Sequence, residues 1–599
     1  NISDTLSGFL QDVKSEYELR KGRKYPYQKF IMAETPISYT GYVRNWKGNS
    51  EQTQPEMVFL PEFATTLPSS NFKFAKERIA DWGRNDPRGG GMEEIDVEMN
   101  VIRDFARRVL LSEETFQEDG NTFVNMFSGE WSGTSKLNKY DLSSMYFNYA
   151  GSIYSQNFPI IDIVMNTMLK QEESTQGRHF FRMFNGMGDD QRAAAYLNGK
   201  SFEQAVLDNT LSTEVFYEMM KLKGVYLRNY INSRLSSNEF KEFMAEFMKK
   251  YQFQEVNFTR LNSEFIRKFH FNLMDFIPNW YTINSTPRFI VKGVDADQVE
   301  IGDYTKYIVK FQVYNPTNVE GVISVNVEEG GGMFPGGPRG RRGRAAQMES
   351  KPAKNYIIEP RKYKEIRILC DERPSNLTIN TNISQNLPST IMQNFAKVTT
   401  TTTDTVTGIF DSNAALFTFN PKEITVDNED PGFRIIESNQ KNKLQSFFKK
   451  ESEDKYKNLN FWMPPSKWTA TIGVNYYGDY INSAVYKKSG SGSNKTEWTT
   501  QIQIPGFYEV FVYTSELPMM GWRRRGSEEK KMQYYTVKHD DGEEEISVET
   551  GRGRQGWMTL GSFYFSAGEA KITLSDKGSE SNQIIFADAV KWVYTNNNK

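Results

Sequence analysis

The spacing of apolar residues changes at Pro287, and this change divides the chain into a helical part and a β-rich part. Before Pro287, apolar residues recur every three or four positions, which is the period of an amphipathic helix. These residues form three runs: Val215, Met219 and Leu222; Phe240, Phe243 and Phe247; and Leu261, Phe265 and Phe269. After Pro287, the segment VEIGDYTKYIVKFQVYNPTNVEGVISVNVEE alternates with a period of two, which is typical of strands. The pattern therefore predicts a multidomain α+β protein.

Residues that can cap helices precede several of the helical runs. Ser236 and Glu239 have the spacing of a capping box, and Thr259 can cap the donors that open the third helix. Residues 180–212 predict two short helices, of which Ser201-Phe202-Glu203-Gln204 opens the second. No nucleophile with a base and an orienting partner can be assembled from this segment.

Composition excludes some classes of protein. The 599 residues predict several domains, and 73 Lys and Arg against 75 Asp and Glu leave no basic footprint for nucleic acid. The single cysteine, Cys370, permits no internal disulfide and lies in the alternating run YKEIRILC, which predicts a buried strand thiol. No apolar run is long enough to predict a membrane helix. The opening residues predict an amphipathic helix and then a strand, so we expect the chain to begin inside a larger protein.

The helix series that closes on Trp280 and leads into the strands resembles the end of the catalytic domain of M1 family metallopeptidases. That family holds zinc with His-Glu-x-x-His on one helix and a Glu from the next. This chain has only His179, His270 and His539, which are too far apart in sequence to build such a helix. The sequence therefore predicts a degenerate M1-peptidase-like domain with no zinc, no cofactor and no catalytic residues.

A second resemblance lies near the N-terminus, in residues 22–62. It rests on Tyr25-Pro26-Tyr27, on Glu34-Thr35-Pro36 and on the run QPEMVFLPE at 54–62. These residues resemble a Gram-negative bacterial family in which an ABC-2 type membrane permease is fused to an M1-like periplasmic domain. The resemblance implies a periplasmic location, tethering to the inner membrane by sequence upstream of this chain, and ABC transporter membrane or ATPase subunits as partners.

An insertion interrupts the strands at residues 330–350, where the sequence reads GGGMFPGGPRGRRGRAAQMES. Such a composition buries too little apolar surface to offset the entropy of ordering, so it predicts a mobile hairpin tip. An exposed loop that binds nothing, or one that meets an anionic surface, is favoured over a nucleic-acid role for its four arginines.

The last segment carries the most specific resemblance. The stretches that carry it are ITVDNEDPGFRI (424–435), YYGDYINSAVY (476–486), GFYEVFVYTSELP (506–518), YYTVKHDDGEEEISVE (534–549), GWMTLGSFYFSAGEAKITLSD (556–576) and IIFADAVKWVY (584–594). They resemble golvesin-like modules, the type described as carbohydrate-binding in xanthan lyases. Short alternating strands, with hairpin turns at Asp541-Gly542 and at Gly568, predict an antiparallel jelly-roll-like sandwich.

The aromatic residues of this segment divide into core and candidate ligand-binding positions. We expect most of them in the core, among them Trp498, Tyr508, Tyr513, Trp557, Phe563 and Phe565. A sugar site needs an aromatic platform beside polar groups. The best candidates are Tyr534, Tyr535 and His539, on one strand near Asp540, with a structural role as the competing interpretation. Trp522, followed by three arginines, is a further candidate in a loop, where partner binding or mobility explains it equally.

These patterns predict three domains. They are an M1-peptidase-like helical domain at 1–286, a β-sandwich at 287–420 with the flexible insertion 330–350, and a golvesin-like β-sandwich at 421–599.

The function we expect is non-catalytic and extracytoplasmic: a binding or scaffold region, associated with an ABC-type permease, that contacts a protein partner or an envelope polysaccharide. One alternative is a secreted or cell-surface carbohydrate-binding protein. The other is an enzyme related to polysaccharide lyases or peptidases, although no base beside a charge-neutralising group stands out.

Overall fold

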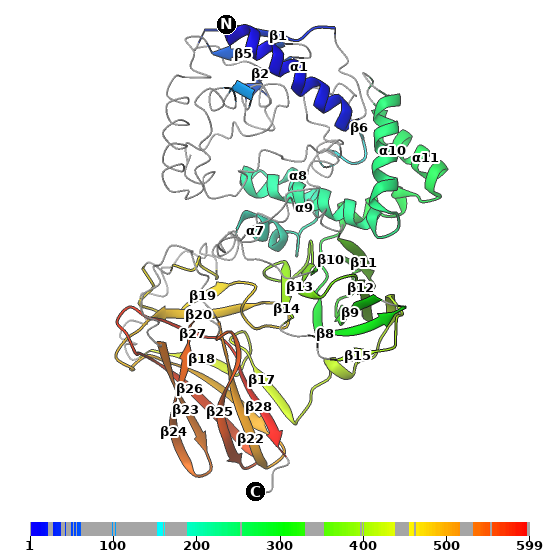
Figure 1. Cartoon of the computed structure of the whole chain (residues 1–599). Helices are drawn as coiled ribbons and strands as arrows, with labels where there is room; N and C mark the ends of the chain where they lie inside the picture. Colours follow the sequence, from blue (N-terminus) through cyan, green and yellow to red (C-terminus); the bar gives the residue numbers. More distant parts are fainter. Residues whose placement is uncertain are drawn as a thin grey trace, which may run out of the picture. The chain divides into compact units, whose positions relative to one another are not determined.

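The computed structural model (Figure 1) divides into two compact units, which we describe separately. One unit comprises Asn1–Gly177 and Asn238–Phe276, and the other Arg178–Ser237 and Ile277–Lys599, so the division cuts through the region 1–286. The residues described are 2–21, 28–36, 42–43, 50–51, 53–54, 57–61, 99, 102–103, 153–159, 161, 164, 188–251, 254, 256–302, 304–329, 353–395, 398, 400–437, 455–460, 463–515, 531–551 and 554–595. The predicted insertion at 330–350 lies outside them.

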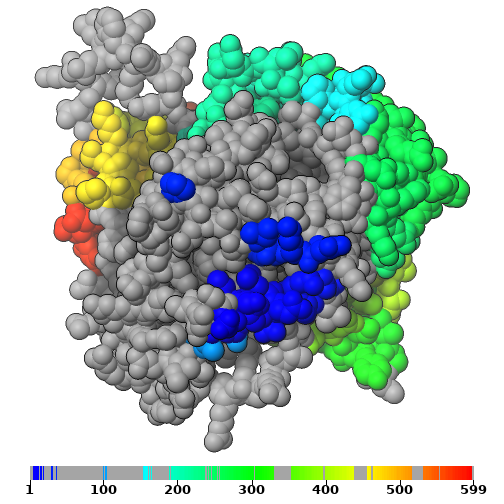
Figure 2. Space-filling view, turned by 90° about the horizontal axis from the view of Figure 1, so that it is seen from above, coloured from blue at the N-terminus to red at the C-terminus, as the bar shows by residue number. Residues whose placement is uncertain are grey.

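The first unit begins with the expected helix and strand. Helix α1 (Ile2–Lys21) lies at the surface (Figure 2), and β1 (Ile31–Thr35) follows it. Strand β1 pairs in parallel with β5 (Met57–Pro61), and β4 (Thr53–Gln54) pairs antiparallel with β5. Two further pairs join β2 to β3 and β6 to β7; the bounds are Tyr42–Val43, Ser50–Glu51, Ile153–Tyr154 and Val256–Asn257.

Helices α10 (Ser237–Lys250) and α11 (Phe258–Phe269) pack through phenylalanine rings, as their apolar spacing predicts. The ring centroid of Phe243 lies 5.2 Å from that of Phe265 and 5.5 Å from that of Phe269, both edge-on. Asn257 caps α11, because its side chain accepts from the backbone N–H of Thr259 at 2.8 Å. The prediction that Thr259 is the cap is therefore wrong by two residues. The 3₁₀ turn η1 (Leu273–Asp275) follows.

The second unit opens with helices α7 (Asp189–Tyr196), α8 (Phe202–Leu207), α9 (Thr213–Asn232) and α12 (Ile277–Thr282). Ser201 and Gln204 form the predicted capping box of α8. Lys223 of α9 is buried, and its ammonium donates a 2.5 Å hydrogen bond to the backbone carbonyl of Trp280. The same ammonium lies 5.7 Å from the ring centroid of Phe202 and 5.2 Å from that of Trp280. Aromatic faces thus surround a lysine that has no carboxylate partner among the contacts of the described residues.

A β-sandwich follows, in agreement with the change of period at Pro287. One sheet has the order β15-β8-β9-β12-β16 and the other β11-β10-β13-β14. Cys370 is fully buried between them, as predicted. The strand bounds are β8 Ile290–Ile301, β9 Tyr304–Tyr314, β10 Gly321–Glu329, β11 Lys354–Ile358, β12 Tyr363–Cys370, β13 Pro374–Asn380, β14 Thr390–Asn394, β15 Thr401–Thr402 and β16 Gly408–Asp411.

A second sandwich forms the C-terminal part, after the 3₁₀ turn η2 (Ala415–Phe417). Its sheets have the orders β17-β28-β22-β25, β18-β21-β26-β23-β24 and β19-β20-β27. The strand bounds are β17 Glu423–Val426, β18 Phe433–Ile436, β19 Thr469–Ile472, β20 Ser483–Lys488, β21 Lys495–Ile502, β22 Gly506–Thr514, β23 Lys531–His539, β24 Gly542–Thr550, β25 Gly556–Phe565, β26 Gly568–Gly578, β27 Ile584–Ala587 and β28 Val590–Thr595. The described part of the chain is thus mostly β.

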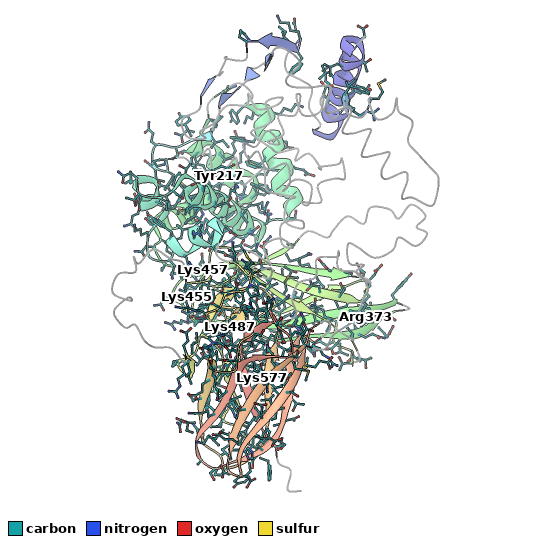
Figure 3. All side chains as sticks on the ribbon, turned by 90° about the vertical axis from the view of Figure 1, so that its left-hand side faces the viewer. Tyr217, Arg373, Lys455, Lys457, Lys487 and Lys577 are labelled. Atoms are coloured by element: carbon teal, nitrogen blue, oxygen red, sulfur yellow. The ribbon has the colours of Figure 1, made fainter. Side chains whose placement is uncertain are left out.

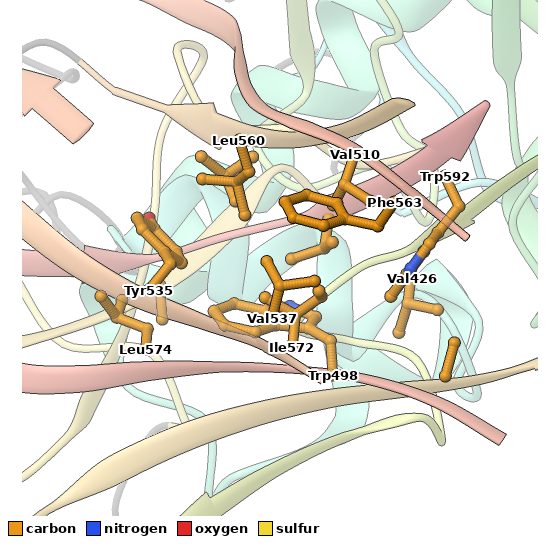
Figure 4. Close-up of a cluster of buried hydrophobic side chains, with 14 of the residues drawn as sticks. Val426, Trp498, Val510, Tyr535, Val537, Leu560, Phe563, Ile572, Leu574 and Trp592 are labelled. Carbon is orange, nitrogen blue, oxygen red and sulfur yellow. The ribbon is translucent and has the colours of Figure 1, made fainter. Parts of the chain in front are cut away.

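The turn residues and the core of this sandwich follow from its sequence. Gly542 and Gly568 open β24 and β26 with φ of 133° and 139°, a conformation that favours glycine, so both predicted hairpin turns are confirmed. Trp498 and Trp592 are buried among aliphatic side chains (Figure 4). Strand β24 is an edge strand, and Glu543, Glu544 and Glu545 are exposed along it.

Candidate functional site

The outer face of the sheet β17-β28-β22-β25 carries a cluster of half-buried aromatic side chains. Successive side chains of a strand point to opposite faces of its sheet. In β22, Val510 and Val512 are therefore in the core, and Phe511 and Tyr513 face outward. On the neighbouring strand β25, Trp557 is paired with Tyr513 and is also half-buried.

Three of these rings contact one another, two of the pairs edge to face and the third, Tyr477 with Tyr513, tilted. The ring centroids of Tyr513 and Trp557 are 5.3 Å apart, and Tyr477 reaches them from the loop between β19 and β20, at 5.7 Å and 5.1 Å. Lys591 of β28 places its ammonium 4.6 Å from the Trp557 ring centroid and 5.6 Å from that of Phe511. Such geometry is favourable for aromatic pairs and for a cation over a ring. We call Tyr477, Phe511, Tyr513, Trp557 and Lys591 the Tyr477 patch.

The patch combines apolar ring surface with hydrogen-bonding groups. Two phenol hydroxyls and an indole N–H come from its rings, and Lys591 adds an ammonium group. Glu423, whose carboxylate lies 3.4 Å from the Lys591 ammonium, balances that charge. A ligand with both apolar faces and many hydroxyl groups matches this combination better than a highly charged one does.

A buried carboxylate holds Tyr477 in place. Asp588, 2 % exposed, lies in the turn between β27 and β28. Its carboxylate accepts from the backbone N–H of Tyr477 at 3.2 and 3.3 Å and from the hydroxyl of Ser515 at 3.3 Å. The loop that carries Tyr477 is thereby tied to the end of the strand next to Tyr513.

Burial shifts the ionisation of the groups around this loop. It raises the pKa of Asp588 well above the ordinary value, and the nearby carboxylate of Asp427 raises it further. Burial likewise raises the pKa of Asp427 to about 8, with Asp430 and Glu429 adding to the effect. The pKa of Tyr513 rises to about 12, through burial and then through Asp588. The Tyr513 phenol therefore stays protonated at neutral pH.

A second aromatic pair lies on the same outer face, toward the other end of β22 and β25. Phe507 and Tyr564 are 39 % and 37 % exposed, are paired across the two strands, and have ring centroids 5.4 Å apart. Between the two aromatic groups, the hydroxyl of Thr559 donates to the carboxylate of Glu509 at 3.4 Å. Exposed aromatic surface therefore recurs along the strands.

The residues predicted as ligand-binding do not lie together. Tyr534 is half-buried on β23 of the opposite sheet. The ammonium of Lys577, labelled in Figure 3, lies 4.4 Å from its ring centroid, and Lys577 also contacts Glu545 at 3.7 Å. Tyr534 thus stands on a charged surface, away from the Tyr477 patch.

Tyr535 points the opposite way from Tyr534, into the core (Figure 4), and is 2 % exposed. Its hydroxyl donates to the side-chain carbonyl of Gln533 at 3.2 Å. This ring cannot be an exposed stacking platform, so its assignment as a ligand-binding residue is corrected. His539 lies at the end of β23 with its ring 5.0 Å from that of Phe563. Trp522 lies outside the described residues.

Sequence reasoning missed the Tyr477 patch because it placed Tyr513 and Trp557 in the core. Trp498, Tyr508, Phe563 and Phe565 are core residues as predicted, whereas Tyr513 and Trp557 face outward. For Tyr513 a signal exists in the sequence: Tyr508 and Tyr513 are five positions apart, so they face opposite sides of a regular strand.

Two kinds of feature were sought in the part of the chain that the structure describes: a metal-binding cluster and a membrane-crossing helix. No group of three or more His, Cys, Asp or Glu side chains there could hold a metal ion. His179 lies outside that part, and His270 is the C-cap of α11. Among the described helices, none is both long and apolar enough to cross a membrane.

Residues 458–594 match the family model of the Golvesin C-terminal domain. The golvesin resemblance of the sequence is thereby confirmed, and we call residues 423–595 the golvesin-like module. The match includes all five residues of the Tyr477 patch. A search of curated proteins found no match to the chain.

Three solved structures are similar to parts of the chain at low identity. A xanthan lyase from Paenibacillus is 15 % identical, with 52 % of this chain and 26 % of that one covered and a TM-score of 0.21. A family 35 carbohydrate binding module from Clostridium thermocellum is 13 % identical (28 % and 98 % covered, TM-score 0.18). Aminopeptidase A from Legionella pneumophila is 13 % identical (63 % and 33 % covered, TM-score 0.25).

The chain thus spans about a quarter of the length of the xanthan lyase. TM-scores this low do not establish a common fold, and we base no argument on these alignments. The M1-peptidase and permease resemblances of the N-terminal region stay predictions.

Proposed function

We propose that this chain binds carbohydrate outside the cytoplasm, with the golvesin-like module as the binding unit and the Tyr477 patch as its site. The observation that carries the proposal is the contact of Tyr477, Tyr513 and Trp557 on an outer sheet face. The family match supports it, because golvesin-like modules are the type described as carbohydrate-binding.

The chemistry of the patch suits a sugar. Pyranose rings offer apolar C–H faces, which can lie against aromatic rings, and hydroxyl groups, which can exchange hydrogen bonds with the phenols and with Lys591. The rings are held by edge contacts and by the Asp588 hydrogen bonds before any ligand arrives. Less ordering entropy is therefore lost on binding.

We propose binding without chemistry. A tyrosine that acts as general base needs a pKa near the working pH. The environment of Tyr513 does the opposite and raises its pKa to about 12. Burial also raises the pKa of Tyr477, with the Asp479 carboxylate as a further cause. Both phenols are therefore suited to donate hydrogen bonds and poorly suited to abstract protons.

The N-terminal resemblance adds a location to this proposal. An M1-like region tethered to an ABC-2 permease would hold the golvesin-like module in the periplasm, within reach of envelope polysaccharide. The matches given above include no permease. The alternative that shares the same binding chemistry is a secreted or cell-surface carbohydrate-binding protein.

Titration calorimetry of the full chain tests the proposal. The ligands are peptidoglycan fragments, a soluble acidic polysaccharide and a soluble neutral one. We expect one class to bind with micromolar to millimolar affinity, roughly 4 to 8 kcal/mol. Trp557→Ala and Tyr513→Ala should each weaken that binding about tenfold, since each removes part of the ring surface.

Tyr534→Ala is the matched control, because it removes a half-buried tyrosine from the opposite sheet of the same module. It should leave affinity unchanged. Loss of affinity in Tyr534→Ala but not in Trp557→Ala would move the site to the strand first predicted. The absence of binding to all three ligands would refute the proposal.

A further inference from the structure

The loop that carries Tyr477 is held from outside its own module. This loop, residues 473–482, connects β19 to β20. Within the module, it is held by the bonds from the Tyr477 N–H to Asp588 and by the Asn482 side chain, which donates to the carbonyl of Tyr476 at 2.9 Å. Its other end meets the loop 381–389 of the preceding sandwich, which connects β13 to β14.

Backbone hydrogen bonds join the two loops at Leu387. The N–H of Leu387 donates to the carbonyl of Tyr480 at 2.9 Å, and the N–H of Asn482 donates to the carbonyl of Leu387 at 2.7 Å. Leu387 and Ile481 thus form a parallel β-bridge. Because both bonds use main-chain atoms, the sandwich fixes the path of the loop and not only one of its side chains.

A side-chain contact lies beside this bridge. The guanidinium of Arg288 lies 4.0 Å from the ring centroid of Tyr480. Two nitrogens of the same guanidinium donate to the side-chain carbonyl of Gln385, at 3.1 and 2.8 Å. Arg288 is therefore oriented by the loop 381–389, and Tyr480 lies against a group that has little freedom to move.

The loop 381–389 is itself fixed by buried polar residues. Asn386 is 1 % exposed, and its side-chain amide bonds both the N–H and the carbonyl of Phe289, at 2.9 and 2.7 Å. Asn382 accepts from the side chain of Asn229 of α9 at 2.7 Å and donates to the carbonyl of Val322 at 2.8 Å. Buried amides that satisfy backbone groups in this way define one conformation of a loop.

Gly478 makes the connection from Tyr480 to Tyr477 short and stiff. Its φ is 154°, and a β-carbon at this position would lie 1.9 Å from the carbonyl oxygen of Ile481. The chain therefore doubles back closely between the bridged residues and Tyr477. Because few residues separate Ile481 from Tyr477, a displacement of Ile481 would also displace Tyr477.

We propose that the loop 381–389 of the sandwich positions the Tyr477 patch: by holding residues 480–482, it sets where Tyr477 closes on Tyr513 and Trp557. Two domains then contribute to the proposed binding site, since the preceding sandwich fixes the loop that places Tyr477 at one side of it. The expected change in ligand affinity rests on the proposed function. The expected change in the mobility of the loop 473–482 does not.

Hydrogen exchange and calorimetry on the full chain test this inference. Arg288→Ala and Tyr480→Ala remove the guanidinium–ring contact, and Tyr480→Phe keeps the ring. We expect the amides of Tyr477 and Asn482 to exchange about tenfold faster in both alanine variants and at the parent rate in Tyr480→Phe. Affinity for whichever of the three ligands the parent chain binds (peptidoglycan fragment, soluble acidic polysaccharide or soluble neutral polysaccharide) should fall about fivefold in the alanine variants alone.

Arg367→Ala is the matched control, because it removes a guanidinium from the ring of Phe410, at 5.4 Å, on a sheet of the same sandwich. It should change neither measurement. An unchanged rate of amide hydrogen exchange at Tyr477 in both alanine variants would overturn the proposal. Faster exchange at Tyr477 together with the parent affinity for the ligand would also overturn it. If the parent chain binds none of the ligands, faster exchange at Tyr477 still supports the positioning role, and the proposed function alone fails.

Discussion

Replacing Lys223 with methionine should stabilise the protein at neutral pH and destabilise it at high pH. Burial of this lysine of α9 lowers its pKa from 10.5 to about 7. A lysine whose pKa is lower in the folded state weakens folding wherever it carries charge in the unfolded chain. The penalty is fully present below pH 7 and disappears as the pH rises from 7 to 10.5.

The size of the effect follows from the contacts. The pKa difference of 3.5 corresponds to at most ~5 kcal/mol of destabilisation at low pH. Lys223→Met removes this penalty but also removes the cation from the Phe202 and Trp280 rings, at ~1 kcal/mol each. It leaves the carbonyl of Trp280 without its donor, at a cost of ~1 to 3 kcal/mol. We therefore expect a net gain of ~1 kcal/mol at pH 7. By pH 10 the folded lysine is neutral, so the penalty is below ~1 kcal/mol, no cation–ring contact remains to be lost, and the missing donor leaves a net loss of ~1 kcal/mol.

Urea unfolding, followed by tryptophan fluorescence at several pH values between 7 and 10, measures this crossover. Lys221→Met is the control on the same helix, because Lys221 is partly exposed and pairs with Glu218 at 2.7 Å. Its effect should stay below ~0.5 kcal/mol at every pH. If the stability difference between Lys223→Met and the parent chain does not change with pH, the lysine is charged in the fold and the reasoning is refuted.

Three further predictions concern the sandwiches. Burial raises the pKa of Asp427 to about 8. The protonated Asp427 therefore contributes its full stability below pH 3.8, and this contribution is lost as the pH rises through 8. Asp427→Asn should raise the melting temperature at pH 9 and change it little at pH 4. Tyr535→Ala should lower the free energy of unfolding by ~3 to 5 kcal/mol in urea titrations, without the selective loss of ligand affinity expected of Trp557→Ala. Deletion of 330–350 should leave the melting temperature within a few degrees of that of the parent chain, since a Gly-, Pro- and Arg-rich segment of this length adds little loop-closure entropy. A large drop in the melting temperature would contradict the prediction that this segment buries little apolar surface.

Local patterns predicted the elements of this protein well. The apolar spacing of Phe243, Phe265 and Phe269 identified helices that pack face to face, and Ser201 with Gln204 identified a helix start. Where two neighbouring residues could serve as a cap, as with Asn257 and Thr259, the sequence offered no means to choose. The change of period at Pro287 likewise predicted a sandwich without indicating its sheet order.

The candidate site was harder to predict, because a β-bulge reverses which side chains face the core. Opposite β22, the register of β25 shifts so that Gly561 pairs with Val510 and Thr559 with Phe511. Trp557 and Phe563 are six positions apart and would share a face of a regular strand, yet one is outside and the other inside. Tyr477 lies in a loop, where no period applies, and its neighbours come from three distant segments.

The glutamates along β24 have a consequence for how copies of this protein coexist. An edge strand presents unpaired N–H and carbonyl groups, which can recruit a strand of another molecule. Glu543, Glu544 and Glu545 are exposed on this edge. Two such edges repel each other at neutral pH, so we expect modules crowded on one surface to stay separate.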